Sequence, residues 1–238
     1  MPGTLVTYQF MRAIDIEVNK HYVDRDIDLI ALSTISDGMD IRTYQNKSCI
    51  QNILNRDNIK NEFLNMIFDK LINKEDYTQK DIAFTIVPKI NCICRGSDKK
   101  LKQNMICSFI GLYNETKMEE TLSEMIKAHK EQRDTVKKFI EDNLDKIDTT
   151  NDIIIYVSKD MPRTYSGLVA GNISQRFYGK PTIMSKDIGK ELAIGSGRSC
   201  ISIINELSAC ESVEWARGHE KQFGIQFKKN ETDTKFLS

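Results

Sequence analysis

The feature of this sequence that most constrains its fold is a long charged stretch at residues 115–146, which separates two parts of different character. Its few apolar side chains recur at helical spacing, and they are Met118, Leu122, Met125, Ile126, Phe139, Ile140 and Leu144. This pattern predicts one long and largely solvated helix. Because the 238 residues of the chain suffice for two small domains, the sequence favours two lobes joined by a helical connector.

The part before the charged stretch is expected to consist of helices around one buried strand. Residues 5–18 and 43–73 carry apolar side chains at helical spacing. Residues 27–36 form a short apolar run, which is typical of a strand in a parallel sheet. Asp37 follows this run, at the strand end where ligands collect in open α/β sheets. The other segments expected here are a helix start at 78–81, a proline-containing loop at 86–95 and a helix at 99–113.

The part after the charged stretch alternates between the two kinds of secondary structure. Residues 153–157 are rich in β-branched side chains, which favours a strand. Further strands are expected at 182–184, 191–198 and 224–227, and helices at 167–177 and 202–210. This alternation predicts a second, α/β lobe.

Composition and charge exclude several classes of protein. The hydrophobic fraction is 40% and the charged fraction 29%, which excludes collagen-like, coiled-coil and strongly disordered chains. No apolar run approaches the roughly 18 residues that a membrane helix needs, and no secretory signal is visible. The 34 basic side chains balance 34 acidic ones, so any nucleic-acid binding must come from local basic patches.

The six cysteines are interpreted as reduced thiols of a cytoplasmic protein. Cys92 and Cys94 are separated by one residue, whereas paired zinc ligands usually have two to four residues between them. Small buried side chains are therefore the preferred interpretation of this pair.

Four short motifs could carry chemistry, and each has a structural alternative. The Gly-Ser-Gly-Arg-Ser motif at 195–199 could grip a phosphate through Arg198, or it could be a kinked strand with a surface arginine. His219, in the Arg-Gly-His motif, could donate to a phosphate, stack on a base or be a surface residue. Asp37 could bind a divalent cation or end a turn. The polar side chains of residues 89–95 could contact phosphates or form a solvated surface.

The order of these motifs resembles the DHH/DHHA1 phosphoesterase family, and within it the RecJ-like single-stranded-DNA-specific exonucleases. Residues 31–37 resemble that family's Ala-Leu-Gly-Thr-Val-Ala-Asp segment, and residues 87–95 resemble its Gly-Pro-Arg-Leu-Asn-Ala-Ala-Gly-Arg segment. Residues 195–199 match its Gly-Ser-Gly-Arg-Ser motif, and residues 217–224 are similar to its Gly-Gly-His-x-x-Ala-Ala-Gly motif. The resemblance covers nearly the whole chain.

The resemblance implies a fold class and an activity. The α/β fold would comprise the C-terminal part of a DHH Rossmann-like parallel-sheet domain (1–112), a connecting helix (113–149) and a DHHA1 α/β domain (150–238). The activity would be hydrolysis of single-stranded DNA from the 5′ end with two Mn²⁺ or Mg²⁺ ions, in the cytoplasm of a bacterium or a phage-infected cell. Asp37 would be the catalytic metal ligand. The residues that would hold the strand are Lys89, Asn91, Arg95, Ser196, Gly197, Arg198, Ser199, Gly218 and His219.

The sequence also departs from the family pattern. Arg217 replaces a glycine, Gln222 and Phe223 replace two alanines, and Lys89 replaces an arginine. The Asp-x-Asp and Asp-His-His motifs, which hold the family's other metal ligands, are absent. We therefore expect this chain to be the C-terminal part of a RecJ-like enzyme, whose partner is an N-terminal fragment that bears the DHH motif. Without that fragment, residues 1–110 are expected to expose apolar surface.

Two other functions stay open at this stage. One is a DHH/DHHA1 phosphodiesterase that hydrolyses short oligonucleotides or cyclic dinucleotides. The other is a catalytically inactive module that binds single-stranded nucleic acid.

Overall fold

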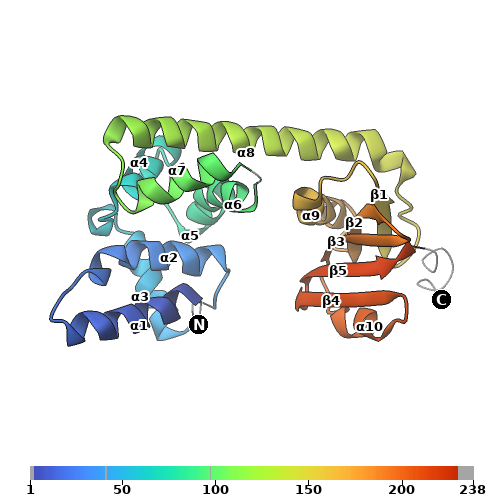
Figure 1. Cartoon of the computed structure of the whole chain (residues 1–238), viewed down its shortest axis with the longest axis horizontal. Helices are drawn as coiled ribbons and strands as arrows, with labels where there is room; N and C mark the ends of the chain where they lie inside the picture. The colour runs from blue at the N-terminus through green and yellow to red at the C-terminus, as the bar shows by residue number, and fades with distance from the viewer. Residues whose placement is uncertain (1–2, 41, 97, 230–238) are drawn as a thin grey trace. The chain divides into compact units, whose positions relative to one another are not determined.

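The chain forms two compact units, of which the first ends at Glu131 and the second begins at Gln132 (Figure 1). The structure, a computed structural model, describes residues 3–40, 42–96 and 98–229. Taken together the two units are mixed α/β, as the sequence predicted. Within these described ranges, no helix has both the length and the apolar character needed to cross a bilayer.

The first unit consists of helices in its described part. The α-helices are α1 (Gly3–Glu17), α2 (Ile27–Ser36), α3 (Tyr44–Ile53), α4 (Glu62–Leu71), α5 (Gln79–Asp81), α6 (Val87–Arg95), α7 (Lys99–Phe109) and the start of α8 (Glu115–Asn143). Short 3₁₀ or π turns lie at η1 (Val23–Asp26), η2 (Arg56–Asn58) and η3 (Ile82–Ile86). The capping box that starts α5 at Thr78 and Asp81 confirms the predicted helix start.

The segment Ile27–Ser36 is helix α2 and not the strand that the sequence predicted. Periodicity does not distinguish a buried strand from a helix that is buried on several faces. The buried apolar side chains of α2 are Ile30, Ala31, Leu32 and Ile35. Thr34 is buried among them because its hydroxyl donates to the carbonyl of Ile30 at 2.8 Å. The described residues of the first unit contain no strand, so the parallel sheet expected there is not found.

A buried carboxylate joins α2 to the start of α4. The Oδ2 atom of Asp28 accepts hydrogen bonds from the backbone N–H groups of Lys60, at 3.0 Å, and Asn61, at 2.8 Å. The side chain of Asn61 then caps α4 by accepting from the N–H of Leu64 at 3.0 Å. The fully buried Asp28 thus satisfies backbone donors that would otherwise lack partners.

Residues 86–95 are also helical, whereas the sequence predicted a proline-containing loop. The π turn η3 leads directly into α6, and Pro88 occupies the first turn of α6. A proline is tolerated there because the N–H groups of the first turn have no partner within the helix. Proline was therefore compatible with a helix start at this place.

Helix α1 confirms the helix predicted at residues 5–18, but its apolar stripe faces outward. The side chains of Val6, Phe10, Ile14 and Val18 are between 41% and 65% exposed. Its buried residues are Leu5 and Asp15. This surface confirms the expectation that the first 110 residues expose apolar side chains, and such a stripe is typical of a surface that another segment covers.

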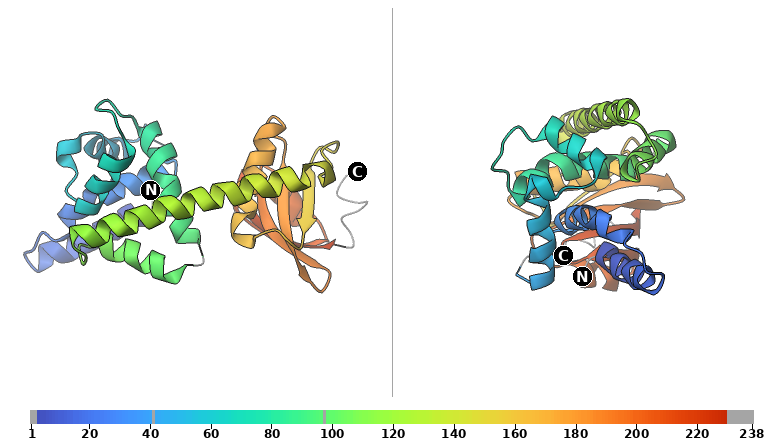
Figure 2. Two further views of the ribbon diagram at one scale, coloured as in Figure 1. Left: turned by 90° about the horizontal axis from the view of Figure 1, so that it is seen from above. Right: turned by 90° about the vertical axis from the view of Figure 1, so that its left-hand side faces the viewer.

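Helix α8 confirms the predicted connector, and it contributes to the cores of both units. Met118, Leu122 and Met125 pack in the core of the first unit. Val136 and Ile140 pack in a core of the second unit. Figure 2 shows α8 as a single helix without a break. The second unit therefore includes the last turns of α8, before the predicted domain start at residue 150.

The second unit is built on a five-stranded sheet with the order β1-β2-β3-β5-β4. Its elements are β1 (Ile154–Ser158), α9 (Ser166–Arg176), β2 (Thr182–Gly189), β3 (Leu192–Arg198), α10 (Ile204–Ala209), β4 (Val213–His219) and β5 (Gln222–Lys228). Strand β1 pairs with β2 in parallel, and the other pairs are antiparallel. The predicted strands and helices of this unit are confirmed, and β4 is a strand that the sequence analysis missed.

The two faces of the sheet are covered differently. One face carries α9, whose Val169, Ala170 and Ile173 pack with Ile154 and Met184 of the sheet. The opposite face carries α10, and its core includes Ile183, Ala193, Leu207, Phe223, Ile225 and Phe227. Figure 1 shows α9 beside β2 and β3, and α10 beside β4.

We predict that the second unit reaches its full stability alone only when it includes the end of α8. A fragment of residues 132–238 should unfold cooperatively in urea. A fragment of residues 150–238 lacks the buried side chains of Val136 and Ile140, each worth about 1.5–3 kcal/mol. Its free energy of unfolding should be lower by several kcal/mol, and equal stability of the two fragments would contradict this account.

Candidate functional site

Arg198 ends strand β3, and its side chain lies between the sheet and the first turns of α9. A Cβ atom placed on Gly167 would lie 2.6 Å from Nη2 of Arg198, and one placed on Gly171 would lie 3.9 Å from Cγ of Arg198. These glycines are four residues apart and so lie on the same face of α9. They leave the space that the arginine side chain occupies.

A serine pair joins the same two elements. The hydroxyl groups of Ser166, in the first turn of α9, and Ser196, on β3, are 3.0 Å apart and share a hydrogen bond. Ser166 is buried. This bond fixes the start of α9 beside β3, the strand that carries Arg198. The Nη1 atom of Arg198 donates to the carbonyl of Gly197 at 2.8 Å.

The place where Arg198 meets α9 favours a negatively charged ligand for two reasons. The N-terminal turn of an α-helix carries partial positive charge and N–H groups that have no partner within the helix. The guanidinium of Arg198 lies against Gly167, the second residue of the 11-residue helix α9. A phosphate would gain from both groups, because a guanidinium can bind it through two parallel hydrogen bonds.

The strand register brings the second-unit candidates together at one end of the sheet. Arg198 of β3 stands opposite Gln222 of β5, which in turn stands opposite His219 of β4. The backbone N–H of Ser199 donates to the carbonyl of Lys221 at 3.1 Å, which ties the end of β3 to the β4–β5 turn. His219 is exposed and ends strand β4.

The glycines among the predicted residues have clear roles in packing. A Cβ atom on Gly197 would lie 2.2 Å from the ring of Phe223, so only glycine leaves room for that ring. Gly218 has a φ of +136°, and a Cβ there would lie 2.8 Å from the carbonyl oxygen of Gln222. Contact of either glycine with a nucleic acid stays a prediction.

In the first unit, Asp37 lies at the C-terminal end of α2 and not at the end of a strand. Its backbone N–H donates to the carbonyl of Ser33 at 2.9 Å, and its side chain is exposed. A carboxylate at this end of a helix meets the negative end of the helix dipole, which is unfavourable unless a cation is near.

The three first-unit residues expected to hold the strand all lie on α6. The amide of Asn91 is 3.5 Å from the hydroxyl of Ser36, beside Asp37, so the structure brings Asn91 to the end of α2. Arg95 is exposed and lies one turn further along the same face of α6. Lys89 points elsewhere, because its ammonium donates to the carbonyl of Thr85 at 2.8 Å.

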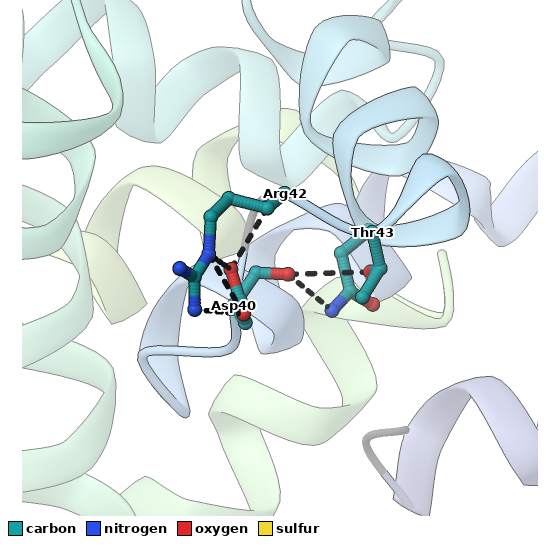
Figure 3. A network of polar contacts seen from close by, with 4 residues as sticks. Asp40, Arg42 and Thr43 are labelled. Atoms are coloured by element: carbon teal, nitrogen blue, oxygen red, sulfur yellow. Dashed lines mark hydrogen bonds and ion pairs between the residues drawn. The ribbon is translucent and has the colours of Figure 1, made fainter.

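A second carboxylate near Asp37 is engaged by an arginine (Figure 3). Asp40 accepts hydrogen bonds from Nε and Nη2 of Arg42, the latter at 2.7 Å. Its backbone carbonyl accepts from Thr43 and Asn46. The Arg42 guanidinium holds the pKa of Asp40 at about 2, below the ordinary value of 3.8. Asp40 therefore stabilises this loop, with its charge already balanced.

The side chains in the described ranges do not fit a metal centre on their own. No three His, Cys, Asp or Glu side chains come together there in an arrangement that could hold a metal ion. All six cysteines are free, with Cys92 buried and Cys94 exposed. Asp37 is thus a single carboxylate, whereas two hard divalent cations need several oxygen ligands.

Sequence reasoning missed some residues of the second-unit site. Gly167 and Gly171 lie against Arg198, and Ser166 bonds to Ser196 on the same strand. The small residues spaced four apart in the predicted helix at 167–177 were the signal that could have indicated a close neighbour. Trp215 lies on β4 next to the site, and no prediction placed it because the strand itself was missed.

We predict that Gly197→Ala destabilises the chain by about 1–3 kcal/mol, because the new methyl group overlaps the ring of Phe223. Urea unfolding measures this change. Gly171→Ala is the matched control, since its methyl group would meet its nearest neighbour at an ordinary contact distance of 3.9 Å. Unchanged stability of Gly197→Ala would contradict the packing described here.

We predict that Arg42→Met raises the pKa of Asp40 from about 2 toward 3.8. Because folding lowers this pKa, the contribution of the pair to stability is present above about pH 4 and is lost as the pH falls toward 2. An NMR titration of the carboxyl group measures the shift. Asp81, whose pKa is about 2 through Lys74 and Thr78, should titrate unchanged. An unshifted Asp40 would show that Arg42 does not hold it.

The chain is similar in sequence to curated proteins that are named as exonucleases. It is 24% identical over 98% of its length to the putative SPbeta prophage-derived single-strand DNA-specific exonuclease YorK of Bacillus subtilis (strain 168). It matches the putative single-strand DNA-specific exonuclease yorK of Bacillus phage SPbeta equally well. The match covers 41% of each relative, so the chain spans less than half the length of these proteins. No family model matches the chain.

Solved structures of RecJ share its fold. RecJ of Thermus thermophilus in complex with Mn²⁺ matches 92% of the chain with a TM-score of 0.75 and 16% identity, over 32% of its own length. The Mg²⁺ complex of that protein gives a TM-score of 0.72. An exonuclease RecJ bound to manganese gives 0.67, over 54% of its own length. The resemblance to RecJ-like exonucleases that the sequence indicated is confirmed.

Proposed function

We propose that this chain is the part of a RecJ-like exonuclease that holds single-stranded DNA while the phosphodiester bond is hydrolysed from the 5′ end. The similarity to proteins named single-strand DNA-specific exonucleases, over 98% of the chain, supports the substrate class. The RecJ fold supports the same assignment. The proposed place of action is the cytoplasm of a bacterial or phage-infected cell.

The observation that carries this proposal is the position of Arg198. Its guanidinium lies against Gly167 at the start of α9, at the sheet end that also carries Ser199 and His219. We propose that a backbone phosphate binds between this guanidinium and the N-terminal turn of α9. Ser196 supports the site by holding α9 to β3, and His219 provides a further donor at the rim.

For the first unit we propose a separate set of contacts with the substrate and a metal ion. Asp37 would supply one carboxylate ligand to a Mn²⁺ or Mg²⁺ site, and its exposure and its place at the negative end of α2 support this. Asn91 and Arg95 would contact the strand nearby, and Lys89 would reach it after leaving the carbonyl of Thr85. The other metal ligands would come from a segment outside the residues described here.

We propose that this same segment, the N-terminal DHH-bearing part, covers the apolar stripe of α1. The exposed side chains of Val6, Phe10 and Ile14 support such a contact. The greater length of the relatives supports the existence of further chain in proteins of this kind. The segment could be continuous with this chain or a separate polypeptide.

A non-catalytic binding module is the second candidate function. The observation that favours it is the absence of a metal-binding cluster of His, Cys, Asp or Glu within the described part of the chain. Under this alternative Arg198 would still bind DNA, and Asp37 would have no effect on any activity.

We predict that Gly167→Ala weakens binding to a fluorescein-labelled oligothymidylate about tenfold or more, because its methyl group displaces the guanidinium of Arg198. Arg198→Gln should weaken binding to a similar degree. Gly171→Ala is the matched control, because it makes the same change one turn away without displacing Arg198. Fluorescence anisotropy measures the three affinities, and equal affinities of Gly167→Ala and Gly171→Ala would contradict the site.

We predict that the full chain degrades a 5′-labelled single strand in Mn²⁺ only when a DHH-bearing segment is supplied. Gel analysis of labelled products measures this, and Asp37→Asn should abolish the activity while leaving DNA affinity unchanged. If Asp37→Asn is fully active in the reconstituted enzyme, Asp37 is not a ligand. If no segment restores activity while Arg198 still binds DNA, the chain is a binding module.

A further inference from the structure

Helix α9 packs on one face of the sheet. On the same face, β5 and β4 carry an uncommon set of side chains, and we call this surface the open face. Its members are Trp215, Arg217, His219, Gln222, Gly224 and Gln226. We propose that the open face binds single-stranded DNA by stacking a base on Trp215, while Arg217 contacts a phosphate next to that base. This inference rests on the proposed function and extends the DNA path from Arg198 across the sheet.

The strand register places these six residues on one face. Trp215 stands opposite Gln226, Arg217 opposite Gly224, and His219 opposite Gln222. Directly opposed residues of an antiparallel pair point to the same side of a sheet. Gln222 also stands opposite Arg198 of β3, so the phosphate site proposed above borders the open face.

Among the described residues, neither α9 nor α10 occupies the open face, and the end of α8 joins the core around Ile154 and Met184. Helix α9 packs on β2 and β3, and α10 packs on the other face, where Phe223, Ile225 and Ala216 point. The side chains of Arg217, His219 and Gln222 are exposed, and Trp215 is half-buried. The open face is thus a surface on which a ligand can lie.

The indole of Trp215 lies along β5 in a way that suits stacking. Its Nε1 atom donates to the side-chain oxygen of Gln226 at 3.3 Å. The opposite edge of the ring covers Gly224, where a Cβ atom would lie 3.2 Å from Cζ3 and 3.5 Å from Cη2. Because Gly224 has no side chain, the indole ring can lie close to strand β5. A base can stack on an aromatic ring held in this manner.

The charges beside this ring match a nucleic-acid backbone. Arg217 lies two residues from Trp215 on the same side of β4. Gln222 of β5 stands between Arg198 of β3 and His219 of β4. Cationic side chains beside an aromatic platform are a combination that binds single strands with little sequence preference. The bases of a duplex are stacked inside it and cannot stack on Trp215, so a duplex would contact only the cationic side chains. The open face should therefore bind single strands more tightly than duplexes.

Trp215 is the one tryptophan of the chain, so its fluorescence reports directly on stacking. The experiment titrates the full chain with oligothymidylate and records tryptophan emission together with the anisotropy of a labelled strand. Saturable quenching with the same midpoint as the anisotropy change is expected. An abasic strand of equal length should bind without comparable quenching, because it offers phosphates but no bases.

Two substitutions separate stacking from mere packing. Trp215→Leu should weaken binding of the single strand about tenfold or more, and Trp215→Phe should restore most of the affinity because it keeps an aromatic face. Tyr44→Leu is the control, since Tyr44 is an exposed aromatic residue of the first unit outside any proposed contact. Urea unfolding shows whether each variant is folded.

The outcomes distinguish this inference from the proposed function. If the chain binds single strands through Arg198 but Trp215→Leu binds as tightly as wild type and emission does not change, the open face is not a binding surface and the proposed function stands. If the wild-type chain does not bind single-stranded DNA at all, both fail. If Trp215→Phe is as weak as Trp215→Leu although both are folded, the ring does not act by stacking and the inference is overturned.

Discussion

The packing of α9 on the sheet is the contact on which the rest of the second unit depends. Val169, Ala170 and Ile173 bury one part of α9 against β1 and β2. On a neighbouring face the helix presents Gly167 and Gly171, so that Arg198 fits between helix and strand. Because α9 covers only the β2–β3 side of this face, the β5–β4 side stays open to a ligand. A single helix thus determines both where the arginine is held and which surface lies beside it.

The first unit shows where sequence reasoning reached its limit. Helices α1 and α7 were predicted from periodicity, but the apolar run at 27–36 is equally consistent with a buried strand and a buried helix. The π turn before Pro88 was not visible, because nothing in local sequence separates a proline in the first turn of a helix from one in a loop. Asp37 therefore follows a helix and not a strand.

The second unit was more predictable because its strands are short, β-branched and bounded by glycine-containing turns. The motif at 195–199 indicated Arg198, and the structure gives it a neighbour that suits an anion. What the sequence could not show was the pairing of β3 with β5 and of β5 with β4. That order places Trp215 and Arg217 beside Arg198, although a helix, α10, lies between them in the chain. Long-range pairing of this kind is set by the fold and not by local spacing.

The central claim is that single-stranded DNA lies across this end of the second unit, and photo-crosslinking tests it most directly. The full chain is irradiated with an oligothymidylate that carries 5-iododeoxyuridine at successive positions, and the modified peptides are identified by mass spectrometry. The account predicts crosslinks within residues 163–171 and 196–226, which an excess of unlabelled strand suppresses. Crosslinks confined to the first unit, or crosslinks that unlabelled strand does not suppress, would contradict it.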